Sequence, residues 1–165
     1  MSNARIFVVG VGNIFLGDDA FGVEVATRMR RRPIPEGVRV DEYGIRGVHL
    51  AYELLEGAYD LVILVDTLDL GEDPGTITVF EPELGGREDV APDAHDLEPA
   101  AVMGLLAGLG GTVGRMLVVG CQPSAMDEHM GLSAPVEASI DEAIRVIEEL
   151  VQEQLSTTPA LIAGL

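Results

Sequence analysis

The hydrophobic pattern of the chain alternates short apolar runs with segments in which apolar residues recur every three to four positions. Short apolar runs are typical of strands that are buried on both faces of a sheet. They predict strands at residues 5–11, 60–66, 76–81 and 115–121, and an alternating segment predicts a further strand at 38–43. The helical spacing predicts helices at residues 20–31, 47–55, 97–109 and 135–155.

This order of elements predicts an α/β fold with a doubly wound, mostly parallel sheet and helices on both of its faces. The strand at 76–81 follows the strand at 60–66 too closely for a helical crossover, so we expect an antiparallel edge strand there. Residues 1–155 are expected to form a single three-layer domain. Residues 156–165 are expected to form a loosely ordered C-terminal tail.

The chain of 165 residues carries a net charge of −18, from 28 acidic residues against 10 arginines and no lysine. Such a field repels phosphate, so we expect neither nucleic acid nor an anionic membrane as a partner. A metal ion, a cationic partner or simple solubility is consistent with the charge. The single cysteine, Cys121, excludes an internal disulfide and a cysteine-rich metal site, and its apolar neighbours predict a buried, unreactive thiol.

The remaining sequence features predict a soluble, cytoplasmic protein. The first strand segment follows the N-terminus without a signal peptide. No apolar run approaches the roughly 20 residues that a membrane-spanning helix needs. Nothing in the sequence indicates a symmetric interface, so we expect a monomer.

Candidate functional residues follow the predicted strands, because open α/β sheets bind ligands beyond the carboxyl ends of their strands. Asp19 follows the first strand, Asp66 ends the strand at 60–66, and His95 precedes the helix at 97–109. Carboxylate and imidazole ligands suit a borderline divalent metal ion, so these three residues are candidates for a metal site. Each also has an ordinary alternative: a helix cap, a strand-end acid and a solvated loop histidine. Spacing alone favours the ordinary roles, because no short-range ligand motif is present.

The glycine-rich segment GVGNIFLGDDAFG, residues 10–22, also allows a Rossmann-like nucleotide- or flavin-binding loop. Gly10 and Gly12 match the G-x-G-x-x-G pattern, but Phe15 occupies the third glycine position. We expect Phe15 to obstruct the close helix–strand packing that this glycine permits, and the neighbouring acids to repel phosphate. A metal ion is therefore the better-supported ligand.

Four segments resemble, in the same order, the endopeptidases that mature nickel–iron hydrogenases by trimming the C-terminus of the large-subunit precursor. The segments are GVGNIFLGDDAFG, VILVDT, HDLEPAAVMGLLAGLGG and VVGCQPSAMDEHMGLSAPVEASIDEAI. The similarity runs from about residue 5 to residue 150. It implies a protease whose substrate is a [NiFe]-hydrogenase large-subunit precursor that already carries nickel.

The resemblance also implies roles for single residues. Asp19, Asp66 and His95 fall on the positions that recognise the nickel, as both catalytic and metal-binding residues. The nickel is then supplied by the precursor, and the isolated protein need not retain a metal. His129 is the alternative third ligand. Gly44, Arg46 and Gly47 are candidates for the loop that lies beside the cleavage site.

Three functions are carried forward from the sequence. The prediction is a nickel-directed processing endopeptidase, and the alternatives are a nucleotide- or flavin-binding domain and a non-enzymatic nickel metallochaperone. Between the adjacent acids, we expect Asp19 to be the ligand and Asp18 to order the loop or cap the helix.

Overall fold

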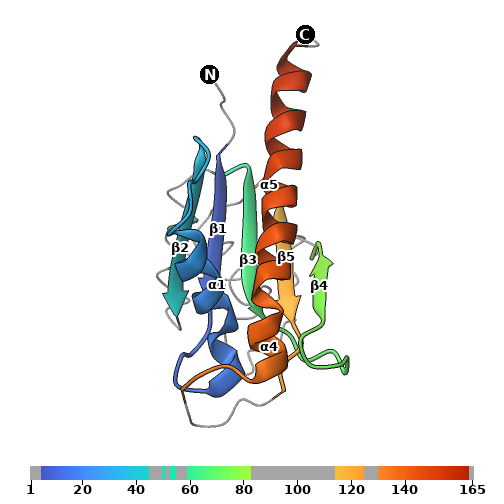
Figure 1. Ribbon diagram of the computed structural model, residues 1–165. Helices are drawn as coiled ribbons and strands as arrows, with labels where there is room; N and C mark the ends of the chain where they lie inside the picture. Colours follow the sequence, from blue (N-terminus) through green and yellow to red (C-terminus); the bar gives the residue numbers. More distant parts are fainter. Residues whose placement is uncertain are drawn as a thin grey trace, which may run out of the picture.

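The computed structural model describes residues 5–44, 50, 53–54, 59–82, 114–124 and 130–163, with residues 157–163 described by their backbone alone. Five strands form one sheet in the order β2-β1-β3-β5-β4 (Figure 1). In chain order they are β1 Ile6–Val11, β2 Val38–Gly44, β3 Leu61–Thr67, β4 Ile77–Phe80 and β5 Met116–Cys121. Every pairing is parallel except the one between β4 and β5. The predicted mostly parallel α/β sheet, with an antiparallel edge strand, is confirmed.

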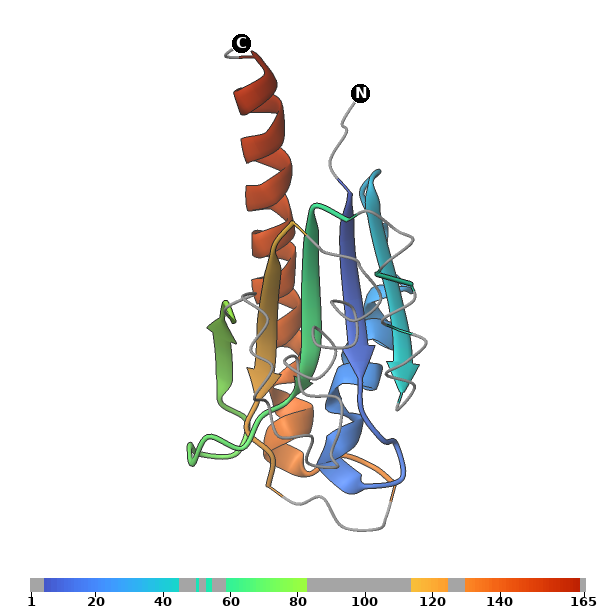
Figure 2. The same ribbon diagram turned by 180° about the vertical axis from the view of Figure 1, so that it is seen from behind.

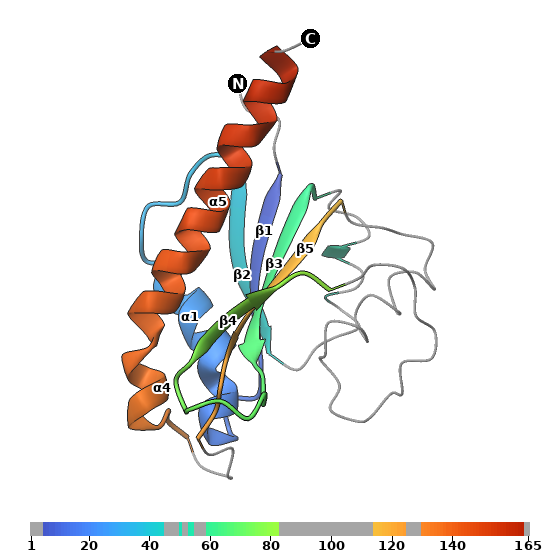
Figure 3. The same cartoon turned by 90° about the vertical axis from the view of Figure 1, so that its right-hand side faces the viewer.

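Helices α1 (Phe21–Met29), α4 (Ala134–Ala138) and α5 (Ile140–Ala163) lie together on one face of the sheet (Figure 3). A short 3-10 helix, η1 (Gly17–Ala20), leads into α1. The structure differs in two ways from the single helix predicted at 135–155. Ser139 divides it, with its Oγ donating a hydrogen bond to the Val136 carbonyl oxygen at 2.7 Å, and the backbone of α5 continues to Ala163.

Other predictions for the helices fall on residues that the structure does not describe. The helix predicted at 97–109 lies outside the described residues. Of the helix predicted at 47–55, Leu50, Glu53 and Leu54 are described and are helical. The division into a domain of residues 1–155 and a tail of residues 156–165 stays a prediction.

Alternate side chains of the strands are buried in two hydrophobic clusters, one on each face of the sheet. Val8 and Ile63 belong to the cluster that includes side chains of α1 and α5. Phe7 and Leu64 belong to the second cluster, which contains the helical Leu50. This two-sided burial explains why β1, β3 and β5 are almost continuously apolar.

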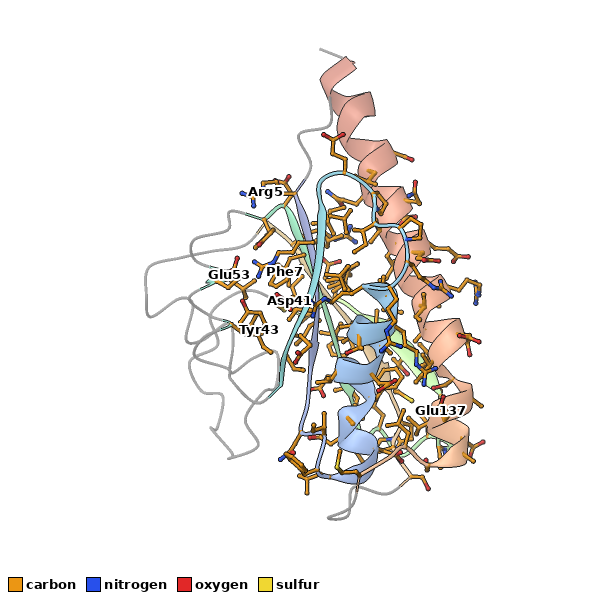
Figure 4. All side chains as sticks on the ribbon, turned by 60° about the vertical axis from the view of Figure 1, so that its left-hand side comes forward. Arg5, Phe7, Asp41, Tyr43, Glu53 and Glu137 are labelled. Atoms are coloured by element: carbon orange, nitrogen blue, oxygen red, sulfur yellow. The ribbon has the colours of Figure 1, made fainter. Side chains whose placement is uncertain are left out.

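Aromatic and charged side chains line the second face near β1 and β2, on the side away from α1 and α5 (Figure 4). The Phe7 ring stacks on Tyr59 with 4.9 Å between centroids, and the Arg39 guanidinium lies 4.8 Å from the Phe7 centroid. Arg39 also forms an ion pair with Glu53. The ion pair attaches the helical residue Glu53 to β2.

Two glycines bring α1 against the sheet. A Cβ on Gly10 would lie 1.9 Å from the Gly22 carbonyl oxygen, and a Cβ on Gly22 would lie 2.2 Å from the Val65 carbonyl oxygen. Only glycine permits so close a backbone approach. The expectation that Phe15 obstructs this packing is wrong, because Phe15 lies in the preceding loop and is 61% exposed. Gly22, seven positions later in the chain than Phe15, makes the contact instead.

Candidate functional site

The carboxyl ends of β1, β3 and β5 meet at one edge of the sheet, which we call the carboxyl edge (Figure 1). Three segments converge there: residues 12–20 with η1, residues 67–76 from the end of β3 to the start of β4, and the connection from β5 to α4. The structure describes both ends of this last connection, at residues 122–124 and 130–133. Figure 2 shows α5 extending past the opposite edge of the sheet. Parallel sheets of this type bind ligands at the carboxyl edge.

Asp18 is fully buried and joins two of these connections. Its Oδ1 accepts a hydrogen bond from the Ser133 backbone N–H at 2.6 Å. Its Oδ2 accepts one from the Ser124 N–H at 2.7 Å and one from the Ser133 hydroxyl at 2.8 Å. The carboxylate therefore fixes both ends of the β5–α4 connection against η1. The predicted role of Asp18 in ordering the loop is confirmed.

Asp19 is partly exposed and is held by two donors from different parts of the chain. The Asn13 backbone N–H donates to its Oδ2 at 2.8 Å, and the Thr67 hydroxyl donates to its Oδ1 at 3.0 Å. A carboxylate offers about four lone-pair positions, so these two bonds leave acceptor capacity on both oxygens. Asp19 is thus oriented by the protein and still able to bind a cation.

Asp66 lies at the end of β3, and its residue is 9% exposed. Its Oδ1 accepts a hydrogen bond from the Thr67 backbone N–H at 2.7 Å. Thr67 therefore bonds both predicted carboxylates, Asp66 through its backbone and Asp19 through its side chain. Two carboxylates that lie 47 positions apart in the sequence thus share one residue as a hydrogen-bond donor.

Two residues of the carboxyl edge follow predicted strands but were given no role from the sequence. Thr67 is one, and its position directly after Asp66 is the signal that could have identified it. Gln122 is the other: its Oε1 accepts hydrogen bonds from the N–H groups of Leu70 at 2.7 Å and Glu72 at 3.2 Å. Its Nε2 donates to Asp69 Oδ1 at 3.0 Å, which lowers the pKa of Asp69. Gln122 thus fixes the β3–β4 connection to the end of β5.

Cys121 takes no part in the candidate site. It is fully buried at the end of β5, with its Sγ 3.4 Å from the Ser139 hydroxyl oxygen. Burial raises the pKa of the Cys121 thiol, which disfavours the reactive thiolate. The predicted burial of this thiol is confirmed.

The remaining candidate residues lie outside the described part of the chain, with one exception. His95, His129, Arg46 and Gly47 are not described, so the third metal ligand stays a prediction. Gly44 is described, and its carbonyl oxygen accepts a hydrogen bond from the Gly12 N–H at 3.0 Å. This bond places the end of β2 beside the loop that carries Asp19.

Within the described ranges, no cluster of three or more His, Cys, Asp and Glu residues could hold a metal ion. The described part of the candidate site therefore supplies two carboxylates, Asp19 and Asp66. No helix in the described part of the chain is long and apolar enough to cross a membrane.

Comparison with known sequences identifies close relatives along most of the chain. Residues 23–150 match the family model described as hydrogenase maturation protease. The hydrogenase 2 maturation protease of Escherichia coli K12 is 30% identical over 152 residues, which cover 90% of this chain and 92% of that protein. The coenzyme F420 hydrogenase subunit delta of Methanothermobacter thermautotrophicus is 31% identical over 160 residues, covering 88% and 93%.

Solved structures give the same result. The hydrogenase maturating endopeptidase HybD from E. coli matches with a TM-score of 0.76 and 29% identity, covering 91% of this chain and 93% of that one. The [NiFe] hydrogenase maturation protease HycI from Thermococcus kodakarensis matches with a TM-score of 0.73 and 25% identity, covering 90% and 93%. The chain therefore belongs to the hydrogenase maturation proteases, a family of endopeptidases.

Proposed function

We propose that this protein removes the C-terminal extension of a [NiFe]-hydrogenase large-subunit precursor that already carries nickel, and that it recognises this nickel through Asp19, Asp66 and His95. The observation that carries the proposal is the pair of carboxylates that Thr67 bonds at the carboxyl edge. Family membership supplies the reaction class. That the enzyme acts as a cytoplasmic monomer stays a prediction.

The chemistry of the pair fits this role. Carboxylate oxygens and an imidazole are suitable ligands for a nickel ion that the precursor holds incompletely coordinated. Binding of the enzyme would then place the scissile peptide bond next to the metal. A metal ion polarises a carbonyl or lowers the pKa of a bound water, and a neighbouring carboxylate can accept the proton that is released.

The nucleotide-binding alternative is disfavoured by the same loop. Asp18 and Asp19 lie in η1, directly before α1, where a Rossmann fold would present backbone N–H groups to phosphate. The metallochaperone alternative uses the same ligands and differs only in the absence of cleavage.

The test is incubation of the protein with nickel-loaded precursor and, in parallel, with nickel-free precursor. We expect mass spectrometry to detect the released C-terminal peptide only in the nickel-loaded sample. Binding of loaded precursor without cleavage would favour the metallochaperone. Cleavage of both samples would show that the protein does not need nickel to recognise the precursor.

Substitutions then test the assigned residues. We expect Asp19→Asn and Asp66→Asn each to lower the cleavage rate at least about 100-fold. Each variant removes one charged ligand from a set of nickel ligands that act as a unit. Normal rates in both variants would show that the assignment is wrong. For the third ligand, we expect His95→Ala to abolish cleavage and His129→Ala to leave it near the wild-type rate.

A further inference from the structure

We infer that Ile14, Phe15 and Met130 form a docking surface for the folded body of the precursor, beside the carboxylate pair. The inference rests on the proposed function, and it adds the part of the enzyme that holds the protein substrate. The matching surface of the precursor has an apolar centre, which contacts the three exposed side chains. It has a basic border, which complements the acidic residues of the carboxyl edge.

The three side chains are exposed although all are large and apolar. Phe15 is 61% exposed, Met130 65% and Ile14 39%. Exposed apolar residues that gather at one site, rather than scattering singly, are typical of interaction surfaces. Phenylalanine and methionine are also enriched in the buried centres of protein interfaces.

Phe15 is presented by a fixed turn rather than by a loose loop. The Phe15 backbone N–H donates to Asn13 Oδ1 at 2.9 Å, and the Leu16 N–H donates to the Asn13 carbonyl oxygen at 3.1 Å. The backbone N–H of the same Asn13 donates to Asp19 Oδ2 at 2.8 Å. Asn13 therefore bonds both the backbone of Phe15 and the predicted nickel ligand, so a partner that touches Phe15 is also placed relative to Asp19.

Met130 lies at the described start of the segment that leads into α4. The segment that leads into α4 passes beside the loop between β1 and α1 (Figures 1 and 2). The hydrogen bonds from Ser133 to Asp18 fix this arrangement, three residues after Met130. The two segments that carry the three exposed side chains are thus joined by hydrogen bonds of the carboxyl edge.

The charge of the carboxyl edge determines the kind of partner. Its described segments, residues 12–20, 67–76, 122–124 and 130–133, contain no arginine or lysine. Asp69, Glu72 and Asp73 are exposed there. Basic residues on the partner would complement this border, whereas an acidic surface would be repelled.

The experiment compares Phe15→Ser and Met130→Ser with Phe80→Ser as the matched control. Phe80 is 38% exposed on β4, outside the segments of the carboxyl edge. We expect KM for nickel-loaded precursor to rise roughly tenfold in the two docking variants, with kcat within about twofold of wild type. The Kd for immobilised loaded precursor should rise by the same factor, and Phe80→Ser should match wild type in both measurements.

The outcomes separate docking from cleavage. Unchanged KM and Kd in both docking variants, with wild-type cleavage intact, would overturn the docking surface and leave the proposed function standing. Binding that weakens in the docking variants, from a wild type that does not cleave, would support docking and overturn the proposed function. Equal loss in Phe80→Ser would overturn the inference. So would a wild-type dimer, detected by light scattering, that Phe15→Ser dissociates, because the occupant would then be a second copy of the chain.

Discussion

At the scale of single residues, Thr67 connects the two carboxylates of the candidate site by two separable hydrogen bonds. Its backbone N–H bonds Asp66 and its hydroxyl bonds Asp19. Thr67→Val removes the hydroxyl at nearly constant volume and keeps the backbone bond. A hydrogen bond to a charged group contributes about 1.5–3 kcal/mol, so we expect kcat/KM for loaded precursor to fall roughly tenfold or more.

Thr67→Ser is the matched control because it restores the donor. We expect it to retain most of the wild-type kcat/KM and to unfold within a few degrees of wild type. A role for Thr67 in stability alone would lower the melting temperature of the valine variant and leave the activity of its folded fraction intact. Wild-type kcat/KM in Thr67→Val would contradict the positioning role.

At the scale of elements, Asp18 ties η1 to the start of α4 and to the residues after β5. In Asp18→Asn, the amide presents an NH2 group where the carboxylate accepts bonds from Ser124 and Ser133. A buried donor then faces other donors, which costs about 1–3 kcal/mol for each unsatisfied group. We therefore expect a lower free energy of unfolding, measured by urea denaturation.

Activity separates the two adjacent acids. At a temperature where Asp18→Asn is folded, we expect it to retain more cleavage activity than Asp19→Asn, because Asp18 is buried and orders the loops. The reverse order of activities would contradict the division of roles between them.

The same scale shows which features can be predicted from the sequence. Strands β1, β3 and β5 were predicted because each is a short apolar run that is buried, and β4 was identified as an edge strand from the short connection before it. The break at Ser139 was missed because it depends on a local hydrogen bond within an otherwise regular helical pattern. Phe15 was misjudged because the glycine that contacts the sheet, Gly22, lies outside the expected motif. Contacts such as that between Thr67 and Asp19 depend on the three-dimensional fold and not on spacing.

At the scale of the whole molecule, the net charge of −18 opposes folding and favours association with a basic partner. The described ion pairs, such as Arg28 with Glu137 at 2.7 Å, lie on the surface and contribute about 0–1 kcal/mol each. Repulsion among the excess carboxylates should therefore exceed their contribution.

We accordingly expect added salt to stabilise the protein. Raising the ionic strength from about 0.01 to 0.1 M shortens the Debye length from roughly 30 to 10 Å and screens the repulsion. A gain of about 1–2 kcal/mol raises the melting temperature by roughly 2–8 °C in a chain of this size. Calorimetry in sodium chloride and in choline chloride distinguishes screening from binding of a specific ion, and a melting temperature that falls with salt would show that the ion pairs dominate.

The same screening should weaken binding of the precursor, because attraction between the acidic carboxyl edge and a basic surface is lost at long range. KM for loaded precursor should then rise over the range of salt concentrations in which the melting temperature also rises. Opposite effects of salt on binding and on stability exclude partial unfolding as the cause of the weaker binding. A KM that does not change with salt would show that charge has no part in docking and that the apolar side chains act alone.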